Sequence, residues 1–264
     1  MIVGPALLFC PADRPERYAK ALAAADSVIL DLEDAVAGPT KAAARVALVA
    51  NPVDPARTIV RVNALGSGEF EADLAWLKRT AYRRVMLAKA ETSEQLARLE
   101  GYDVTALCET ARGIINAAAI ASAPNVVALM WGAEDLVAGL GGQSSRDAAG
   151  SYRGVAAQAR ASVLLAAGAH GKQAIDAVYI DVADTEGLTA EAEDAAASGF
   201  AHKACIHPSQ AALVRDAFRP AEEEVDRARR VVEAASGGGV LMVDGVMVDA
   251  PLVAQARVVL SRTR

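Results

Sequence analysis

The sequence has little of what marks several large classes of protein. It contains 3 cysteines and 4% aromatic residues among its 264 residues. Cys10, Cys108 and Cys205 are odd in number and show no CxxC spacing. Such sparse cysteines are typical of reduced thiols in the cytoplasm and argue against a disulfide framework.

The sequence also lacks an excess of positive charge and long apolar runs. Its formal net charge is −6 and its pI is about 5.2, whereas a nucleic-acid-binding protein would show a basic face. No apolar stretch reaches the roughly 18–20 residues that a membrane helix needs. The first residues, MIVGPALLFCPADRPE, have no leading positive charge and become polar at Asp13, unlike a secretory signal. We therefore expect a cytoplasmic protein without a nucleic-acid or membrane partner.

What is present is a regular alternation of apolar runs and helical patterns. The chain is 53% hydrophobic, which is enough for one large core. Short apolar runs rich in Val, Ile and Leu predict buried strands, each followed by a helix. The predicted strands are Ala6–Cys10, Ser27–Leu32, Thr58–Val62, Arg84–Ala88, a strand beginning at Val104, another beginning at Val126, Ala177–Val182 and Ala204–Ile206.

These 8 strand–helix units favour a closed (β/α)8 barrel, the TIM barrel of the α/β class. An open, doubly wound sheet is the alternative. The first predicted strand is followed by PADRPE, without the glycine-rich GxGxxG turn that binds a dinucleotide phosphate in such a sheet. The sequence therefore favours the barrel.

The last part of the chain departs from this repeat. Pro220–Ala235 has the pattern of an amphipathic helix, with acidic residues in its first turn and basic ones later. Gly237–Gly239 interrupts the chain, and VLMVDGVMVD then predicts a hairpin with Asp-Gly at its tip, followed by a helix from Pro251. We predict a catalytic barrel domain over residues 1–235 and a C-terminal helix–hairpin–helix arm over residues 236–264. The arm would cover the mouth of its own barrel or of a neighbour's.

Two of the apolar runs end abruptly in a carboxylate. Glu109 follows VTALC, and Asp135 comes shortly after VVALMW. Ligands of parallel α/β folds bind at the carboxyl ends of the strands, and paired carboxylates are hard oxygen ligands for a cation such as Mg²⁺. The alternative is that Glu109 caps the following helix and Asp135 pairs with an arginine. Considered as a pair, the two residues favour a metal site.

Other charged or polar residues lie at, or just after, the ends of the remaining predicted strands. They are Asp31, Glu33 and Asp34, Arg61 and Asn63, Lys89, Asp181, and His207. Catalytic groups of a TIM barrel come from the ends of several strands. Carboxylates for a metal, an arginine for a substrate carboxylate and further acids for proton transfer suit small anionic carbonyl compounds.

A glycine-rich loop follows the run that carries Asp135. Its segment Gly141–Ser145, GGQSS, could supply the backbone N–H groups of Gly141 and Gly142 to a second substrate carboxylate. A plain linker would need no such role. The sequence leaves both interpretations open.

Six motifs in order resemble those of the citrate lyase beta-subunit-like family, within the HpcH/HpaI aldolase and malyl-CoA lyase superfamily. The resemblance covers essentially the whole chain. The motifs are RVN at Arg61–Asn63, ETARG at Glu109–Gly113, GAEDL at Gly132–Leu136, AIDAVYIDVAD at Ala174–Asp184, KACIHPSQ at Lys203–Gln210 and DGVMVDAP at Asp244–Pro251.

The resemblance implies a TIM barrel, usually a homotrimer, that breaks or forms a carbon–carbon bond of β-hydroxyacyl thioesters with Mg²⁺. It implies that Glu109 and Asp135 ligate the metal and that Arg61 binds the carboxylate of a 2-oxoacid. Asp249 would be an acid/base group that the arm contributes to a neighbouring subunit; without the resemblance, a cap at the end of the hairpin is favoured. Asp31, Glu33, Asp34 and Lys89 would surround this site.

The nature of the thioester stays open at this point. One prediction is a carbon–carbon lyase that cleaves citramalyl-, malyl- or citryl-CoA into acetyl-CoA and a 2-oxoacid. An alternative is the beta subunit of a citrate lyase complex, acting on a citryl group carried by an acyl-carrier protein. A third is a 2-oxoacid aldolase that uses no thioester.

Overall fold

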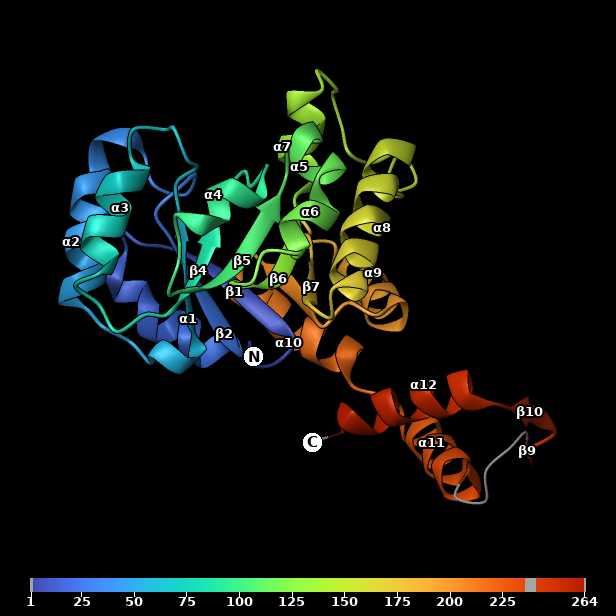
Figure 1. Ribbon diagram of the computed structural model, residues 1–264. Helices are drawn as coiled ribbons and strands as arrows, with labels where there is room; N and C mark the ends of the chain where they lie inside the picture. The colour runs from blue at the N-terminus through green and yellow to red at the C-terminus, as the bar shows by residue number, and fades with distance from the viewer. Residues whose placement is uncertain (1, 236–240, 264) are drawn as a thin grey trace. The chain divides into compact units, whose positions relative to one another are not determined.

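The computed structural model describes residues 2–235 and 241–263. The strands that alternate with helices along the chain form a closed barrel in which β1 to β8 pair in sequence order, all parallel, and β8 returns to β1 (Figure 1). The predicted TIM barrel is confirmed. The strands are β1 (Ala6–Pro11), β2 (Ser27–Asp31), β3 (Thr58–Val62), β4 (Arg84–Leu87), β5 (Asp103–Cys108), β6 (Val126–Trp131), β7 (Gln173–Asp176) and β8 (His202–Cys205).

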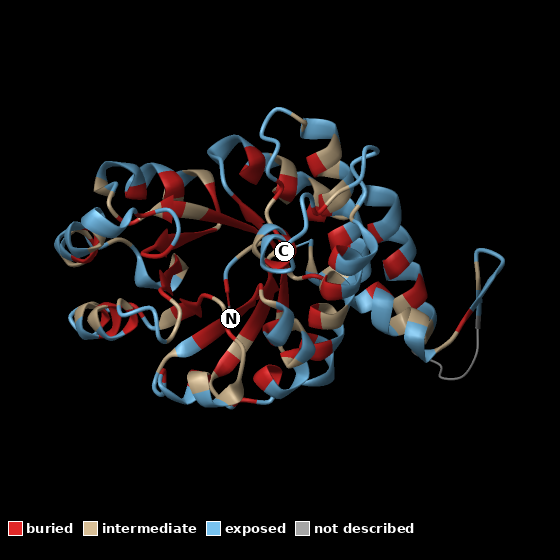
Figure 2. Ribbon diagram, turned by 90° about the horizontal axis from the view of Figure 1, so that it is seen from above, coloured by how far each residue is buried: buried red, intermediate tan, exposed pale blue. Residues whose placement is uncertain are grey.

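Helices connect successive strands and cover the outside of the barrel. Their outer faces are exposed, whereas the strands between them are buried (Figure 2). The helices are α1 (Tyr18–Ala24), α2 (Lys41–Ala50), α3 (Phe70–Leu77), α4 (Ser93–Ala97), α5 (Ala111–Ile115), α6 (Ala117–Ala121), α7 (Ala133–Gly139), α8 (Gly154–Ala169), α9 (Thr185–Ser198) and α10 (Pro208–Phe218), with short 3₁₀ turns at Pro15–Arg17, Gly38–Thr40 and Pro55–Arg57.

Alternate residues of the strands fill the inside of the barrel. This core contains Leu7, Ile29, Ile59, Met86, Leu107, Met130, Ile175 and Ala204. Because side chains alternate between the two faces of a strand, a residue two positions after a core residue faces the same interior, nearer the mouth. Asp31, Arg61 and Glu109 each stand two positions after a core residue, so the strand register itself carries them to the mouth.

The structure corrects the sequence prediction at β7. We predicted a strand over Ala177–Val182, but the paired segment is Gln173–Asp176. The error arose because Asp176 interrupts the apolar pattern, whereas the four residues Ala177–Ile180 that follow it are an apolar run. In the fold Asp176 is fully buried and ion-paired, while Ile180 and Val182 are exposed.

The connection between β5 and β6 contains two short helices, α5 and α6, that meet at Asn116. The Asn116 side chain donates a hydrogen bond to the main-chain carbonyl of Glu91, 2.8 Å away. Side chains of this kind compete with regular helix geometry.

The chain divides into two compact units, Met1–Val214 and Arg215–Arg264. Within the second unit, α11 (Glu222–Ala234) packs against α12 (Ala250–Ser261) through Ala228, Val231 and Ala256. The division into a catalytic barrel over residues 1–235 and an arm over residues 236–264 stays a prediction. The predicted hairpin is present as β9 (Leu241–Val243) and β10 (Val246–Val248), joined through Asp244 and Gly245, both with positive φ. The predicted break at Gly237–Gly239 lies outside the described residues.

In the part of the chain that the structure describes, every helix is too short or too polar to cross a bilayer.

Candidate active site

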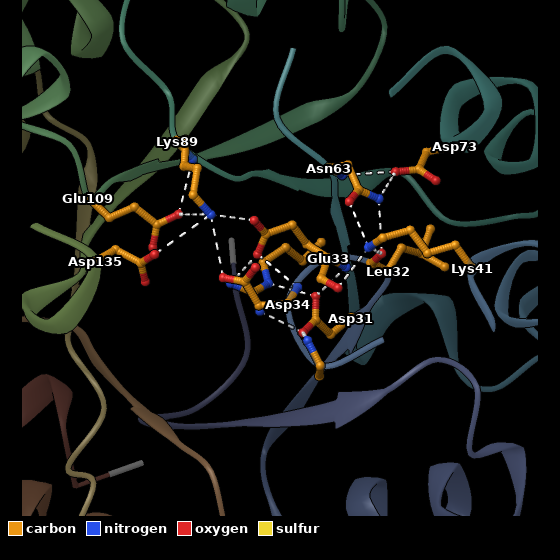
Figure 3. A network of polar contacts seen from close by, with 12 residues as sticks. Asp31, Leu32, Glu33, Asp34, Lys41, Asn63, Asp73, Lys89, Glu109 and Asp135 are labelled. Atoms are coloured by element: carbon orange, nitrogen blue, oxygen red, sulfur yellow. Dashed lines mark hydrogen bonds and ion pairs between the residues drawn. The ribbon is translucent and has the colours of Figure 1, made fainter. Parts of the chain in front are cut away.

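Seven charged side chains meet at the carboxyl ends of β2 to β6, and we call them the mouth cluster. Ion pairs at 4.0 Å or less connect them to one another (Figure 3). Its members are Asp31, Glu33, Asp34, Arg61, Lys89, Glu109 and Asp135. The structure therefore brings together the charged residues that the sequence predicted for the site in the barrel.

Arg61 is the most tightly held member. Its Nε and Nη2 donate to the two carboxylate oxygens of Asp31, each at 2.6 Å, and its Nη1 lies 3.1 Å from Glu33 Oε2. The guanidinium also lies over the ring of Phe9, 4.9 Å from its centroid. Burial opposes the charge of Arg61, but Asp31 and Glu33 outweigh it and raise the pKa of the guanidinium. The group is thus a fixed positive charge in one orientation.

Asp31 is itself anchored at the end of β2. Its carboxylate accepts hydrogen bonds from the main-chain N–H groups of Glu33 and Ala35, at 2.8 and 3.0 Å. The turn after β2 therefore folds around this side chain, which explains why three acidic residues can stand so close together here.

Lys89 lies at the centre of the acidic groups. Its ammonium forms a short ion pair with Glu33 and lies 3.4 Å from Asp34, 3.7 Å from Asp135 and 3.9 Å from Glu109. Burial opposes the charge, but the carboxylates of Glu33 and Glu109 raise the pKa of Lys89. The two segments that carry Glu109 and Asp135 contain no lysine, and the lysine that contacts them follows β4.

Glu109 and Asp135 form the carboxylate pair at the ends of β5 and β6. Glu109 is 3% exposed, and Asp135 lies in the first turn of α7 with its side chain 41% exposed. Burial first, and then the neighbouring charge of Asp135, raise the pKa of Glu109 to about 8. Two carboxylates that disfavour each other's charge in this way are relieved by a shared cation.

Gly132 makes room for this pair. A Cβ at Gly132 would lie 2.8 Å from Glu109 Cβ and 2.9 Å from Glu109 Oε2. Only glycine therefore allows the Glu109 carboxyl to lie against the turn between β6 and α7. We did not identify Gly132 from the sequence, although it stands within the motif GAEDL.

The donor set fits a magnesium site that is completed by substrate and water. Mg²⁺ in enzymes is held by one or two carboxylates together with substrate groups, rather than by a full cage of protein ligands. Glu109 and Asp135 supply two such carboxylates, and both already face a cation, the Lys89 ammonium. Within the described residues, no group of three or more His, Cys, Asp or Glu is placed to hold a metal ion.

Lys41 supports the mouth cluster from behind, and its role was not found from the sequence. Its ammonium donates to the carbonyls of Leu32 and Glu33 and to Asn63 Oδ1, at 2.8 to 2.9 Å (Figure 3). Asn63 in turn donates through Nδ2 to Asp73, at 2.7 Å. Lys41 begins a helix and follows no strand, so the strand-end argument could not select it.

The glycine-rich loop after α7 uses two of its main-chain N–H groups in hydrogen bonds to the end of that helix. The N–H groups of Gly141 and Gly142 donate to the carbonyls of Ala138 and Val137, at 2.9 and 2.8 Å. These bonds close the end of α7, and Gly141 has the positive φ typical of a helix end. Neither amide is available to a substrate carboxylate in this conformation, which favours the alternative that the segment is a connection.

Two further residues predicted at strand ends are not brought to the mouth cluster. Asp181 is exposed and accepts hydrogen bonds from the N–H groups of Ala183 and Asp184, because β7 ends earlier than predicted. His207 is exposed, and its Nδ1 lies 2.7 Å from Ser209 Oγ at the start of α10. Both have local roles.

Asp249 lies in the second compact unit, at the start of α12. Its carboxylate caps this helix by accepting a hydrogen bond from the N–H of Leu252, at 3.4 Å. The cap that we considered as the alternative role is therefore present. A catalytic role of Asp249 in a neighbouring subunit stays a prediction.

A second group of charged residues, which we call the wall cluster, was not predicted as a unit. Asp176 and Lys203 point away from the barrel core toward α8 and α9, and their ion pair of 3.0 Å is fully buried. Lys203 also contacts Glu191 at 2.8 Å. The wall cluster comprises Arg146, Arg160, Asp176, Glu191, Asp194 and Lys203.

The fold and the mouth cluster define an α/β barrel whose carboxylate-rich site lies at the carboxyl ends of its strands. The HpcH/HpaI aldolase/citrate lyase family matches residues 6–208, and the chain belongs to this family. A citrate lyase subunit beta-like protein of Mycobacterium tuberculosis (strain H37Rv) is 55% identical over 98% of this chain and 95% of its own length.

Two further comparisons extend this result. The mitochondrial citramalyl-CoA lyase of Homo sapiens is 33% identical and covers 88% of this chain and 77% of its own. The crystal structure of protein CitE from Mycobacterium tuberculosis in complex with magnesium, acetoacetate and coenzyme A is similar with a TM-score of 0.95 and 55% identity. It covers 99% of this chain and 98% of that chain.

Proposed function

We propose that this protein is a Mg²⁺-dependent carbon–carbon lyase that cleaves, or forms, a β-hydroxyacyl-CoA thioester such as citramalyl-, malyl- or citryl-CoA. The products of cleavage are acetyl-CoA and a 2-oxoacid. The single observation that carries the proposal is the buried carboxylate Glu109 beside Asp135, facing a cation and adjoined by the fixed guanidinium of Arg61. Similarity to a structure containing magnesium, acetoacetate and coenzyme A supports the choice of ligands.

Each residue of the site has a distinct task in this reaction. Bound Mg²⁺ supplies the positive charge that acidifies the substrate hydroxyl, so that the adjacent carbon–carbon bond can break. Glu109 and Asp135 hold the ion. Arg61 has five N–H groups, and its bonds to Asp31 and Glu33 fix the direction in which it meets the 2-oxoacid carboxylate.

The second fragment leaves as the enolate of the acetyl thioester and must receive a proton on its methylene carbon. We assign this proton transfer to the carboxyl of Asp249, contributed by a neighbouring subunit of a homotrimer. The test is subunit mixing: Glu109→Ala and Asp249→Asn proteins are each assayed alone and after exchange of subunits. A shared site predicts partial recovery of activity in the mixture, whereas a site within one chain predicts none.

The proposal is tested by an assay that follows acetyl-CoA, free CoA and 2-oxoacid separately. The purified protein is offered citramalyl-CoA, malyl-CoA and citryl-CoA with Mg²⁺, and again after EDTA. We expect acetyl-CoA and 2-oxoacid in equal amounts, and no turnover in EDTA. Free CoA without 2-oxoacid would indicate thioester hydrolysis instead.

Two other outcomes would contradict the proposal and identify the alternatives. Turnover of citryl-acyl-carrier protein alone, in the presence of partner subunits, would make the chain a citrate lyase beta subunit. Aldol activity with pyruvate and simple aldehydes, without CoA binding, would make it a 2-oxoacid aldolase.

A further inference from the structure

Lys89 combines two unusual features in one residue. Its backbone has φ of 52°, in the left-handed region that few residues other than glycine adopt. Its main-chain N–H donates to Glu109 Oε1 at 3.1 Å, while its side chain turns back among the carboxylates (Figure 3). Residues in such conformations concentrate at functional sites, where surrounding contacts fix them.

The position of the ammonium conflicts with that of a metal ion. Nζ of Lys89 lies 3.7 Å from Asp135 Oδ1 and 3.9 Å from Glu109 Oε1. A divalent cation that binds both carboxylates would lie within about 6 Å of this ammonium, because Mg²⁺ lies about 2.1 Å from its oxygen ligands. Two positive charges at such separations repel strongly in a partly buried site. On the other side of the ammonium, Glu33 and Asp34 offer a second pair of acceptors.

We propose that Lys89 is the resident counter-ion of the Glu109–Asp135 pair, and that a divalent cation binds by displacing its ammonium away from this pair, leaving it on Glu33 and Asp34, which it already contacts. This inference rests on the proposed function, because it uses the same metal site. Before metal binding, the Lys89 ammonium lies beside both carboxyl groups and opposes the rise in the pKa of Glu109. In exchange, it weakens the affinity for the metal, because the ion must compete with a charge already present.

The inference predicts opposite effects of one substitution on two properties. In Lys89→Met the backbone contact to Glu109 is retained but the positive charge is removed. We expect the Kd for Mg²⁺ to fall by about tenfold. The Tm of the protein in EDTA should fall, because the carboxylates of the mouth cluster then repel one another, and the increase in Tm produced by Mg²⁺ should become larger.

The experiment measures the Kd for Mg²⁺ alone by calorimetry, at one pH, together with Tm in EDTA and in excess Mg²⁺. Lys78→Met is the control, because Lys78 is an exposed lysine outside the mouth cluster. Its Kd should stay within about twofold of the original. If Lys89→Met does not fold, Lys89→Asn removes the same charge with a residue that tolerates positive φ.

The outcomes separate this inference from the proposed function. Mg²⁺ binding by the original protein, with unchanged or weaker binding by the Lys89 variant, would overturn the inference and leave the metal site in place. No Mg²⁺ binding by the original protein would overturn both. Tighter Mg²⁺ binding in Lys89→Met, with the affinity of Lys78→Met unchanged, supports the inference.

Discussion

The mouth cluster and the wall cluster contain the same residue types but differ in charge balance. The mouth cluster has five acidic residues and two basic ones, whereas the wall cluster has three of each. The mouth cluster faces the barrel interior at the strand ends, and Lys89 and Asp135 are partly exposed. The wall cluster is centred on two fully buried residues, Asp176 and Lys203.

The two clusters respond differently to burial. Glu109 keeps a raised pKa, about 8, because burial and the Asp135 charge together outweigh the nearby cations. Burial acts in the same direction on Asp176, but Lys203, Arg160 and the indole N–H of Trp131 outweigh it and lower its pKa. A buried carboxylate with a complete set of partners supports the fold. One with a surplus of negative neighbours is suited to receive a cation from outside.

The largest expected effect comes from removing one of the two carboxylates of the mouth cluster that are proposed to hold the metal. Glu109→Ala or Asp135→Ala should lower kcat/KM by about a thousandfold or more, because each removes a carboxylate that holds the metal. Steady-state assay with the preferred thioester measures this loss. Glu71→Ala is the control, since Glu71 forms an exposed ion pair with Arg98. Near-normal turnover in either site variant would remove these residues from the site.

The next largest effect is a loss of stability when one buried charge of the wall cluster is removed. Lys203→Met leaves Asp176 buried without its main partner and should lower the free energy of unfolding by about 3–5 kcal/mol. Urea denaturation measures the change, and exposed Lys78→Met serves as the control. At a temperature where Lys203→Met is folded, its affinity for Mg²⁺ should be unchanged. A large loss of Mg²⁺ affinity with unchanged stability would reverse the roles of the two clusters.

A pH series sharpens the contrast between Glu109 and Asp176. Glu109 has a pKa of about 8 in the folded protein, compared with an ordinary value of 4.5. Between these two pH values the folded protein therefore binds a proton that the unfolded protein does not. In EDTA, the contribution of Glu109 to the free energy of unfolding should fall as the pH rises from about 4.5 to 8, by at most about 1.4 kcal/mol per pH unit. Denaturation of Glu109→Gln should show a flatter profile over this range.

Asp176 should behave in the opposite sense. Its pKa lies below the ordinary value of 3.8, so its contribution is present above that pH and is lost only as the pH falls through the lowered pKa. Asp176→Asn should therefore lower the free energy of unfolding without changing how steeply it depends on pH between pH 5 and 8.

The test of Glu109 is the same pH dependence in Glu109→Gln. If the free energy of unfolding changes with pH equally in the original protein and in Glu109→Gln, the raised pKa of Glu109 is contradicted.

The smallest predicted effect concerns the space around Glu109. Gly132→Ala places a Cβ 2.9 Å from Glu109 Oε2 and should displace this carboxylate, weakening Mg²⁺ binding by about tenfold. Gly139→Ala is the matched control, because a Cβ there has no atom within 4 Å apart from its own helix backbone and chain neighbours. Calorimetry with Mg²⁺ compares the two variants. Equal affinity in both would show that the close contact does not shape the site.

Much of the barrel and of the mouth cluster could be predicted from the sequence, because strand ends are visible as the ends of apolar runs. Asp31, Arg61, Lys89 and Glu109 were selected in this way, and the barrel order follows from strict alternation. The same reasoning placed β7 wrongly, since a buried Asp176 with long-range partners breaks the pattern on which the prediction depends.

What could not be predicted depends on contacts between distant segments. Lys41 reaches the mouth from a helix, and Gly132 matters only because Glu109 lies against it. The pairing of Asp176 with Lys203 requires β7 and β8 to be neighbours in register. Sequence position alone contains none of these distances.

The most direct test of the central claim is a crystal structure of the protein with Mn²⁺ in place of Mg²⁺, measured by anomalous scattering. The account predicts one strong peak between the carboxylates of Glu109 and Asp135, with the Lys89 ammonium moved away from them. A peak ligated by other residues, or Lys89 still between the two carboxylates, would contradict it.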